Sequence, residues 1–367
     1  MPELVVLTEQ LLAPVPGGTG RYTRELTAAL AAAAPEGWTV AGVTAWHRDP
    51  GAARIPGVAG PRPLPLPRRA LTLAWEHGLP PWPGGDIVHA PTPLAPAAAR
   101  RGRALVVTVH DTVPFTHPET LTPRGAAWHQ AMIRRATLRA DAVVVPTAAV
   151  AADLATHAPG PAPVHVIGHG VSRLPEEPVD LDLPQKYVLA VGTVEPRKGL
   201  DVLVEALAHG PDLPLVVVGP PGWGGVDLRA LAAAHGLPPD RVRVLGRVTD
   251  AELAEVLRRA TVFAAPSRAE GFGLPMLEAM AAGVPVVHSD APALVEVAGG
   301  AGVSTPRGDP AELARALRAV SSSPEHAAAL SAGGKARAAT FTWEKAAAAV
   351  WSLHLGLRAA ADEFTRS

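Results

Sequence analysis

The chain has 367 residues, 48% of them apolar, so it is long enough for two domains of ordinary size with substantial cores. Lysine and arginine total 33 against 34 aspartate and glutamate residues, and this near-neutral balance gives no electrostatic reason to expect nucleic-acid binding. The absence of cysteine excludes disulfides, thiolate metal sites and a cysteine nucleophile.

The amino terminus, MPELVVLTEQ, lacks the basic start and apolar stretch of a signal peptide and predicts a first β-strand instead. No run of 18 apolar residues occurs, so no membrane-spanning helix is predicted. These features favour a cytoplasmic protein.

Short apolar, β-branched runs alternate with longer Ala- and Leu-rich stretches through most of the chain. Continuous apolar runs between helices are typical of parallel strands that are covered on both faces, so an α/β fold with doubly wound sheets is expected. The predicted strands are Leu4–Leu7, Thr39–Val43, Asp86–His89, Leu105–Val109, Ala142–Val145 and Val164–Ile167, then Tyr187–Val191, Leu215–Val218, Val242–Leu245, Val262–Ala264 and Val284–Val287.

Two Pro-rich segments interrupt this alternation. Val171–Gln185 reads VSRLPEEPVDLDLPQ, and its prolines exclude helix interiors and central strands, which indicates an interdomain linker. Pro50–Arg69 is interpreted as a long irregular loop. The predicted division is therefore 1–172, a linker at 173–186, a second domain at 187–342, and a final helix at 343–367 that returns to the first domain.

The segment Pro266–Val287 predicts a strand, a Gly-containing loop and a helix start. Gly271 and Gly273 would let the backbone approach a ligand, and the exposed amides and dipole of a helix start favour a pyrophosphate. Glu278, on the helix, is placed to accept hydrogen bonds from ribose hydroxyls, and Glu270 lies on the ligand side of the loop. By spacing alone, a loop with a solvated glutamate is an equally good interpretation.

Arg197 and Lys198 lie between a strand that ends at Gly192 and a helix that begins near Gly199. Ligands of open α/β sheets bind at the carboxyl ends of strands, so these two cations are candidates to hold a diphosphate. The alternative is a pair of solvated cations, one of them paired with Glu195.

The segment Pro14–Leu26 begins PVPGGTG, directly after the first strand, and is not a GxGxxG fingerprint. It predicts a Gly-rich turn that either admits a sugar or phosphate or serves only as a tight turn, with Thr19 as the cap of the next helix.

His110 and Asp111 follow the strand Leu105–Val109, a position that faces a ligand crevice, and Asp111 is a candidate to orient the imidazole. A lone histidine there is more often structural. The sequence has no metal-ligand pattern, no GxSxG and no GxxxxGK[ST], so it supports neither a metalloenzyme nor a serine hydrolase nor a phosphate-loop NTPase.

Taken together and in this order, the motifs resemble glycosyltransferase family 4, which has the GT-B fold of two Rossmann-like domains that face a cleft. The residue at position 169 is His where the family usually has Asn, and position 19 is Thr where Ile is usual. The matching segments are EGFGLPMLE (Glu270–Glu278, the E-x7-E signature), GTVEPRKG (Gly192–Gly199), GGTGRYTREL (Gly17–Leu26), HGV (His169–Val171) and the pattern of Gly246–Ser267.

The resemblance implies a role for each site residue. Glu278 would bind the ribose, Glu270 the hydroxyls of the donor sugar, and Arg197 with Lys198 the diphosphate. His110 would lie near the reactive carbon and C6 hydroxyl of that sugar. The remaining implied contacts are the backbone of Gly271, Phe272, Gly273 and Leu274 with the sugar and phosphate, Arg247 and Val248 with the base, and Gly17, Gly18 and Gly20 with the diphosphate and acceptor.

Such enzymes retain the anomeric configuration, by a preferred front-face mechanism that needs no enzyme nucleophile. Catalysis then depends on positioning and on stabilising the anionic leaving group, so neither a cofactor nor a metal ion is expected, and domain closure would exclude water. The co-substrate would be a nucleotide-diphospho-sugar.

The donor and acceptor stay open. The resemblance favours GDP-mannose, with UDP-glucose, UDP-N-acetylglucosamine and deoxysugar nucleotides as alternatives, and the acceptor is a glycan, a lipid-linked sugar or a small molecule. Other readings are a GT-B-fold sugar-nucleotide epimerase and a non-catalytic sugar-nucleotide-binding subunit. Two clusters of arginines could contact an anionic membrane, although solvated basic faces are the favoured interpretation of both. One lies on Thr122–Arg139 and contains Arg134, Arg135 and Arg139, together with Trp128, and the other contains Arg100, Arg101 and Arg103.

Overall fold

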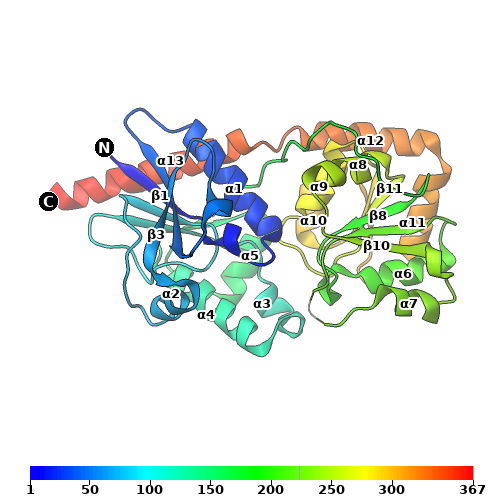
Figure 1. The fold of residues 1–367 in the computed structure, drawn as a ribbon, viewed down its shortest axis with the longest axis horizontal. Helices are drawn as coiled ribbons and strands as arrows, with labels where there is room; N and C mark the ends of the chain where they lie inside the picture. The colour runs from blue at the N-terminus through cyan, green and yellow to red at the C-terminus, as the bar shows by residue number, and fades with distance from the viewer. Residues whose placement is uncertain (223, 367) are drawn as a thin grey trace. The chain divides into compact units, whose positions relative to one another are not determined.

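The computed structural model describes residues 1–222 and 224–366, and of residues 362–366 the backbone only. The chain forms two compact units (Figure 1). The first unit comprises Met1–Phe115, Arg124–Gly170 and Thr342–Ser367, and the second comprises Thr116–Pro123 and Val171–Phe341.

Within the described residues, the first unit contains a sheet of seven parallel strands in the order β3-β2-β1-β4-β5-β6-β7. The central strands are buried along their whole length, as continuous apolar runs predict. The strands are β1 (Glu3–Leu7), β2 (Thr39–Trp46), β3 (Ala59–Pro67), β4 (Ile87–Ala90), β5 (Ala104–Thr108), β6 (Ala142–Val145) and β7 (Val164–Val166).

Helices cover both faces of this sheet, and each face has its own apolar cluster. The last helix, α13 (Trp343–Arg366), packs beside α1 (Gly17–Ala32), where the Trp351 indole N–H donates to the carbonyl oxygen of Leu30 at 2.9 Å. The other helical segments are η1 (Glu9–Leu12), η2 (Gly51–Ala53), α2 (Arg68–Glu76), α3 (Val113–Thr116), η3 (Pro118–Thr120), α4 (Pro123–Arg139) and α5 (Ala148–His157).

The described part of the second unit contains a sheet of six parallel strands in the order β10-β9-β8-β11-β12-β13. The strands are β8 (Val188–Val191), β9 (Leu215–Val218), β10 (Val242–Gly246), β11 (Val262–Ala265), β12 (Val286–Ser289) and β13 (Val303–Thr305). Its helical segments are η4 (Pro196–Lys198), α6 (Leu200–His209), α7 (Leu228–Ala234), η5 (Pro239–Arg241), α8 (Asp250–Arg259), α9 (Leu274–Ala281), α10 (Pro292–Ala298), α11 (Pro310–Ser322) and α12 (Pro324–Ala338).

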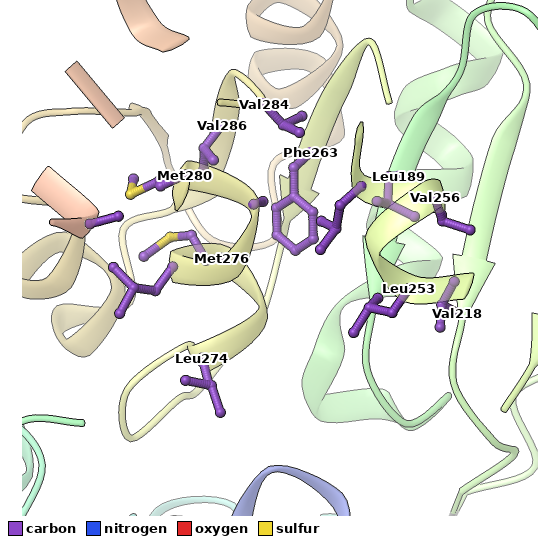
Figure 2. Packing of buried hydrophobic residues seen from close by; sticks show 14 of the residues in the cluster. Leu189, Val218, Leu253, Val256, Phe263, Leu274, Met276, Met280, Val284 and Val286 are labelled. Carbon is purple, nitrogen blue, oxygen red and sulfur yellow. The ribbon is translucent and has the colours of Figure 1, made fainter. Parts of the chain in front are cut away.

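One face of the second sheet is packed under α8 and α9. Figure 2 shows Phe263 of β11 at the centre of this cluster, with Met276 of α9 to one side and Leu189 of β8 to the other. Phe263 is 1% exposed and Met276 is also 1% exposed. Because α9 packs on β11 in this way, the start of the helix is held next to the carboxyl ends of β8 and β11.

The α/β class with two Rossmann-like parallel sheets is confirmed, and each predicted strand overlaps an observed one. The prediction of an irregular loop over Pro50–Arg69 is wrong, because that segment contains β3 and the beginning of α2. Strand β3 lies at the sheet edge, pairs only with β2 among the described strands, and shows register shifts, so its prolines need not donate to a second neighbour.

Candidate functional site

The strand order of the second unit reverses between β8 and β11, because the chain runs outward to β10 on one side and to β13 on the other. Such a switch point opens a ligand crevice at the carboxyl ends of the two strands. Two connections leave the sheet there: η4 follows β8, and the loop Ser267–Gly273 follows β11.

Three predicted site residues from these connections form one ion cluster. The carboxylate of Glu270 accepts from Lys198 Nζ at 2.6 Å, from Ser267 Oγ at 2.8 Å and from Arg197 Nη1 at 3.2 Å. Arg197 also donates to Glu195 at 2.7 Å, as the sequence had suggested. The side chains of the cluster's ions are only 12–18% exposed.

The neighbouring charges keep the Glu270 carboxylate ionised. Burial raises the pKa of Glu270, but the charges of Lys198 and Arg197 and the hydrogen bonds from Lys198 and Ser267 outweigh it and lower the pKa to about 2. The two cations are therefore matched by the carboxylates of Glu270 and Glu195. An entering polyanion can exchange for these carboxylates without leaving the buried cations uncompensated.

The loop after β11 enters α9 through Gly273, which has φ 88° and is the N-cap, with Pro275 in the first turn. A Cβ on Gly273 would lie 2.4 Å from a side-chain carbon of Leu294, so both the conformation and the space require glycine. Figure 2 shows Leu274 at the start of α9, beside the loop that precedes this helix. Positions 271–274, all buried, thus lead from the loop after β11 into α9 at the switch point.

Phe272 and Glu278 are both buried, with 4% and 5% exposed surface. The Phe272 ring packs edge to face on Phe341 at 5.7 Å between centroids, so the ring belongs to the apolar core of the second unit. Glu278 lies in the second turn of α9, one turn inside the helix start.

Arg247 and Val248 follow β10, the edge strand, and precede the capping box of α8. Arg247 is exposed, while Val248 is partly buried against the core under α8. They lie at the same carboxyl edge of the sheet as the ion cluster, and β9 separates their strand from β8.

In the first unit, His110 follows β5. Its Nε2 lies 2.8 Å from the carbonyl oxygen of Pro91, which can only accept, so Nε2 carries the proton and Nδ1 keeps its lone pair in the neutral ring. Burial lowers the pKa of His110 more than the Pro91 hydrogen bond and the charge of Asp111 raise it. The imidazole is therefore neutral near pH 7 and offers an acceptor at Nδ1.

The prediction that Asp111 orients His110 is corrected by these contacts. The carboxylate of Asp111 accepts from the backbone N–H of Val113 at 3.1 Å, whereas Pro91 receives the imidazole hydrogen bond. Asp111 affects the imidazole through its charge.

The glycines of the first motif are not in a loop. Helix α1 begins at Gly17, so Gly18 and Gly20 lie in its first turn and Thr19 does not cap it. A Cβ on Gly20 would lie 2.4 Å from Cβ of Pro16, whereas one on Gly17 or Gly18 would meet nothing within 4 Å. Gly17 and Gly18 therefore leave open space at the start of α1, and Gly20 is required by packing.

Sequence reasoning missed a buried polar chain behind His110. The Tyr22 hydroxyl lies 3.2 Å from Thr108 Oγ1, which lies 2.9 Å from Nε2 of His89, and His89 Nδ1 lies 3.1 Å from Nε2 of His354. The Tyr22 ring also packs edge-on against His110 at 4.6 Å between centroids. No local sequence pattern predicts this series of hydrogen bonds, because its members come from α1, β4, β5 and α13.

The basic residues considered for membrane contact are partly committed to the protein. Arg135 donates to the carbonyl oxygens of Trp75 and Glu76, and Arg134 lies 4.9 Å over the Phe115 ring. Arg103 is paired with Asp86. A surface pocket of about 760 Å³ lies among residues 76–82, 96–98, 100, 135 and 139.

Among residues 1–222 and 224–366, no helix is both long and apolar enough to cross a bilayer. Among the described side chains, those of residues 1–222 and 224–361, no group of three or more His, Asp or Glu is arranged to hold a metal ion.

Two family models match the chain: "Glycosyltransferase Family 4" over residues 16–173 and "Glycosyl transferases group 1" over residues 176–337. The D-inositol 3-phosphate glycosyltransferase of Streptomyces scabiei is 32% identical, over 91% of this chain and 85% of its own length. The O-antigen chain mannosyltransferase B of Escherichia coli is 39% identical, but over only 44% of this chain and 43% of its own length.

Among solved structures, sucrose-phosphate synthase from Thermosynechococcus elongatus has a TM-score of 0.77 and 25% identity, over 98% of this chain and all of that one. The sequence matches and this likeness agree with the two parallel sheets and the E-x7-E segment described above. The chain therefore belongs to the family 4 glycosyltransferases.

Proposed function

We propose that the protein transfers a hexose from a nucleotide-diphospho-sugar to an acceptor hydroxyl with retention of configuration. The observation that carries this proposal is the buried ion cluster of Arg197, Lys198 and Glu270 at the β8–β11 switch point. Two cations held at the carboxyl ends of strands, beside a helix start, suit a diphosphate leaving group.

In the proposed reaction, Arg197 and Lys198 exchange their contacts with the glutamates for the phosphate oxygens. Glu270, released from part of its ion pairing, accepts from the hydroxyls of the donor sugar. The Arg fork fits two phosphate oxygens at once and the Lys ammonium acts as a point charge. Charge that develops on the leaving diphosphate is thus stabilised by groups already in place.

We assign His110 a contact with the donor sugar as a neutral acceptor. The Pro91 carbonyl occupies its Nε2–H, so Nδ1 accepts from a sugar hydroxyl. This assignment differs from a cationic role, because burial disfavours the imidazolium form.

The test of the proposed function uses Arg197→Ala and Lys198→Ala. Each change should reduce turnover by about 100-fold or more, since one charge-stabilising donor contributes on the order of 3 kcal/mol to such a transition state. Arg315→Ala is the matched control, because that arginine is 69% exposed and its ion pair is with Glu312 on its own helix. Near-normal turnover in either site variant would refute the assigned role.

For the donor we propose GDP-mannose, which the mannosyltransferase name of one relative supports. A thermal-shift screen of GDP-mannose, UDP-glucose, UDP-N-acetylglucosamine and deoxysugar nucleotides tests this choice. A ligand at 100 times its Kd adds about 2.7 kcal/mol to stability and raises the melting temperature. A larger shift with a uridine donor would replace the proposal.

The same donors, incubated without acceptor, separate transfer from isomerisation. A transferase should leave the sugar unchanged or hydrolyse it slowly, and formation of an epimer would identify an epimerase instead. Binding without turnover toward any acceptor would indicate a non-catalytic subunit.

Peripheral membrane contact stays a prediction. The exposed arginines of the two basic clusters, which could meet anionic lipid, are Arg100, Arg101, Arg103, Arg134 and Arg139. Sedimentation with phosphatidylglycerol vesicles at low salt tests it, and an unbound protein would reject it.

A further inference from the structure

A second ion pair lies directly beside the proposed diphosphate site. The guanidinium of Arg268 donates to both carboxylate oxygens of Asp201, at 2.8 and 2.7 Å. The same Nη1 also donates to the carbonyl oxygen of Pro196 at 2.7 Å. Arg268 thereby ties the first turn of α6 to the first residue of η4.

The backbone of Arg268 joins the same two connections. Its N–H donates to the carbonyl oxygen of Arg197 at 2.8 Å, and Arg197 Nη1 donates to the carbonyl oxygen of Ala269 at 3.0 Å. In addition, Arg307 donates to the Arg268 carbonyl oxygen at 3.3 Å. Arg268 therefore contacts η4 through both its main chain and its side chain.

The segment that carries the two cations depends on such support. Helix η4 spans only Pro196–Lys198, closed by single-turn bonds from Lys198 to Glu195 and from Gly199 to Pro196. A 3₁₀ turn of this length has poor hydrogen-bond geometry and no packing face of its own. Its position therefore depends on the segments bonded to it, and the loop after β11 is one of them.

We propose that Arg268 and Asp201 form a positioning pair that holds η4, and with it Arg197 and Lys198, in the geometry that receives the leaving diphosphate. This inference rests on the proposed function. Asp201 neutralises Arg268, and the two side chains together hold the first turn of α6 against η4. Arg268 is thus a support of the diphosphate ligands and is not itself one of them.

The competing interpretation is an ordinary surface ion pair, since the two side chains are 33% and 41% exposed. Such pairs have little effect on stability and none on chemistry. The bond to the Pro196 carbonyl distinguishes the two interpretations, because an isolated surface pair would not reach the backbone that carries the catalytic cations. A positioning role should appear in kcat, where small misplacements of a charge are most costly.

The experiment compares Arg268→Lys, Asp201→Asn and the double variant with wild type, by steady-state kinetics and by calorimetric titration of GDP and UDP. Lysine keeps the charge but cannot form the fork together with the Pro196 bond. Each single variant should lower kcat by about tenfold or more, with a smaller change in the Kd of the nucleoside diphosphate. The double variant should be no slower than the worse single variant, because the two residues act as one unit.

Arg315→Lys and Glu312→Gln provide the control pair, on α11 of the same unit. A kcat within twofold of wild type in both site variants would overturn the proposal. So would a double variant whose loss equals the product of the single losses. If Arg268→Lys fails to fold, Asp201→Asn decides alone, because its side chain keeps the size of aspartate.

Failure of the proposed function looks different. In that case the wild-type protein itself binds neither GDP nor UDP and turns over no donor. If the wild-type protein binds GDP or UDP and turns over a donor, while the kcat of the site variants is unaffected, only the positioning role is refuted.

Discussion

Replacing Glu270 by Gln removes the central charge of the ion cluster without changing the volume of the side chain. In the native chain the carboxylate has a pKa of about 2, against an ordinary 4.5. At 1.36 kcal/mol for each pKa unit, this difference corresponds to about 3 kcal/mol of stability at neutral pH. The side chain is only 12% exposed, so solvent screens little of this contribution.

The sign of the pH dependence follows from the lowered pKa. The contribution of Glu270 is complete above pH 4.5 and is lost as the pH falls toward 2, because the unfolded chain takes up the proton first. Glu270→Gln should thus be less stable than wild type by about 3 kcal/mol at pH 7 but by only about 2 kcal/mol at pH 3.5.

The assay is urea unfolding followed by circular dichroism at both pH values, with Glu176→Gln as control. Glu176 is an exposed carboxylate between the two sheets in sequence, and its removal should change neither midpoint. Equal stability of Glu270→Gln and wild type at pH 7 would refute the reasoning, and so would a difference that grows as the pH falls.

The same variant has a second expected effect. Without the carboxylate, Lys198 and Arg197 lose a counterion, so GDP should bind at least as tightly as to wild type while turnover falls. Weaker GDP binding would show that Glu270 supports the diphosphate site by position and not by charge balance.

Gly199→Ala should destabilise by about 3 kcal/mol or more, since φ is 63° and the new Cβ would lie 2.1 Å from the Pro266 carbonyl oxygen. Gly236→Ala, at φ 72° in open space, should cost only about 1 kcal/mol in the same urea assay. Tyr22→Phe should lower the free energy of unfolding by about 1 kcal/mol and leave kcat unchanged. Tyr22→Ala should lower it by about 3–5 kcal/mol and should also lower kcat, because the neighbouring His110 ring loses a packing partner. Trp351→Phe should cost about 1–3 kcal/mol in thermal unfolding, because its buried indole bond is lost. Wild-type stability in Gly199→Ala, Tyr22→Ala or Trp351→Phe would contradict the packing described.

The elements of the fold were largely predictable from the chain itself. A continuous apolar run such as Ala142–Val145, set between helical stretches, indicates a strand buried on both faces, and the structure has one there. The failure at β3 has a local cause, because its prolines argue against a central strand and its edge position is not visible in the sequence. The first turn of α1 was missed for a similar reason, since three glycines there indicate a turn as readily as a helix start.

The candidate site was predictable only in part. Arg197, Lys198 and Glu270 could be placed on connections that follow strands, because motif and strand end are adjacent in sequence. Their mutual contacts could not, because Glu270 lies 72 residues from Lys198. The roles of Arg268 and Tyr22 could not be predicted from the sequence either, since each depends on a partner from another element.

By itself, the sequence determined most of the segments that become strands and helices and which loops carry charge, because these depend on local apolar periodicity and on proline and glycine. Only the tertiary structure decided that β8 adjoins β11 and that the two charged loops therefore meet. The same is true of the hydrogen bond between His89 and His354, which spans 265 residues. Strand order is set by the packing of all elements on one another, and no single segment encodes its neighbours. The E-x7-E segment thus becomes a candidate diphosphate site only when the sheet brings Arg197 and Lys198 beside it.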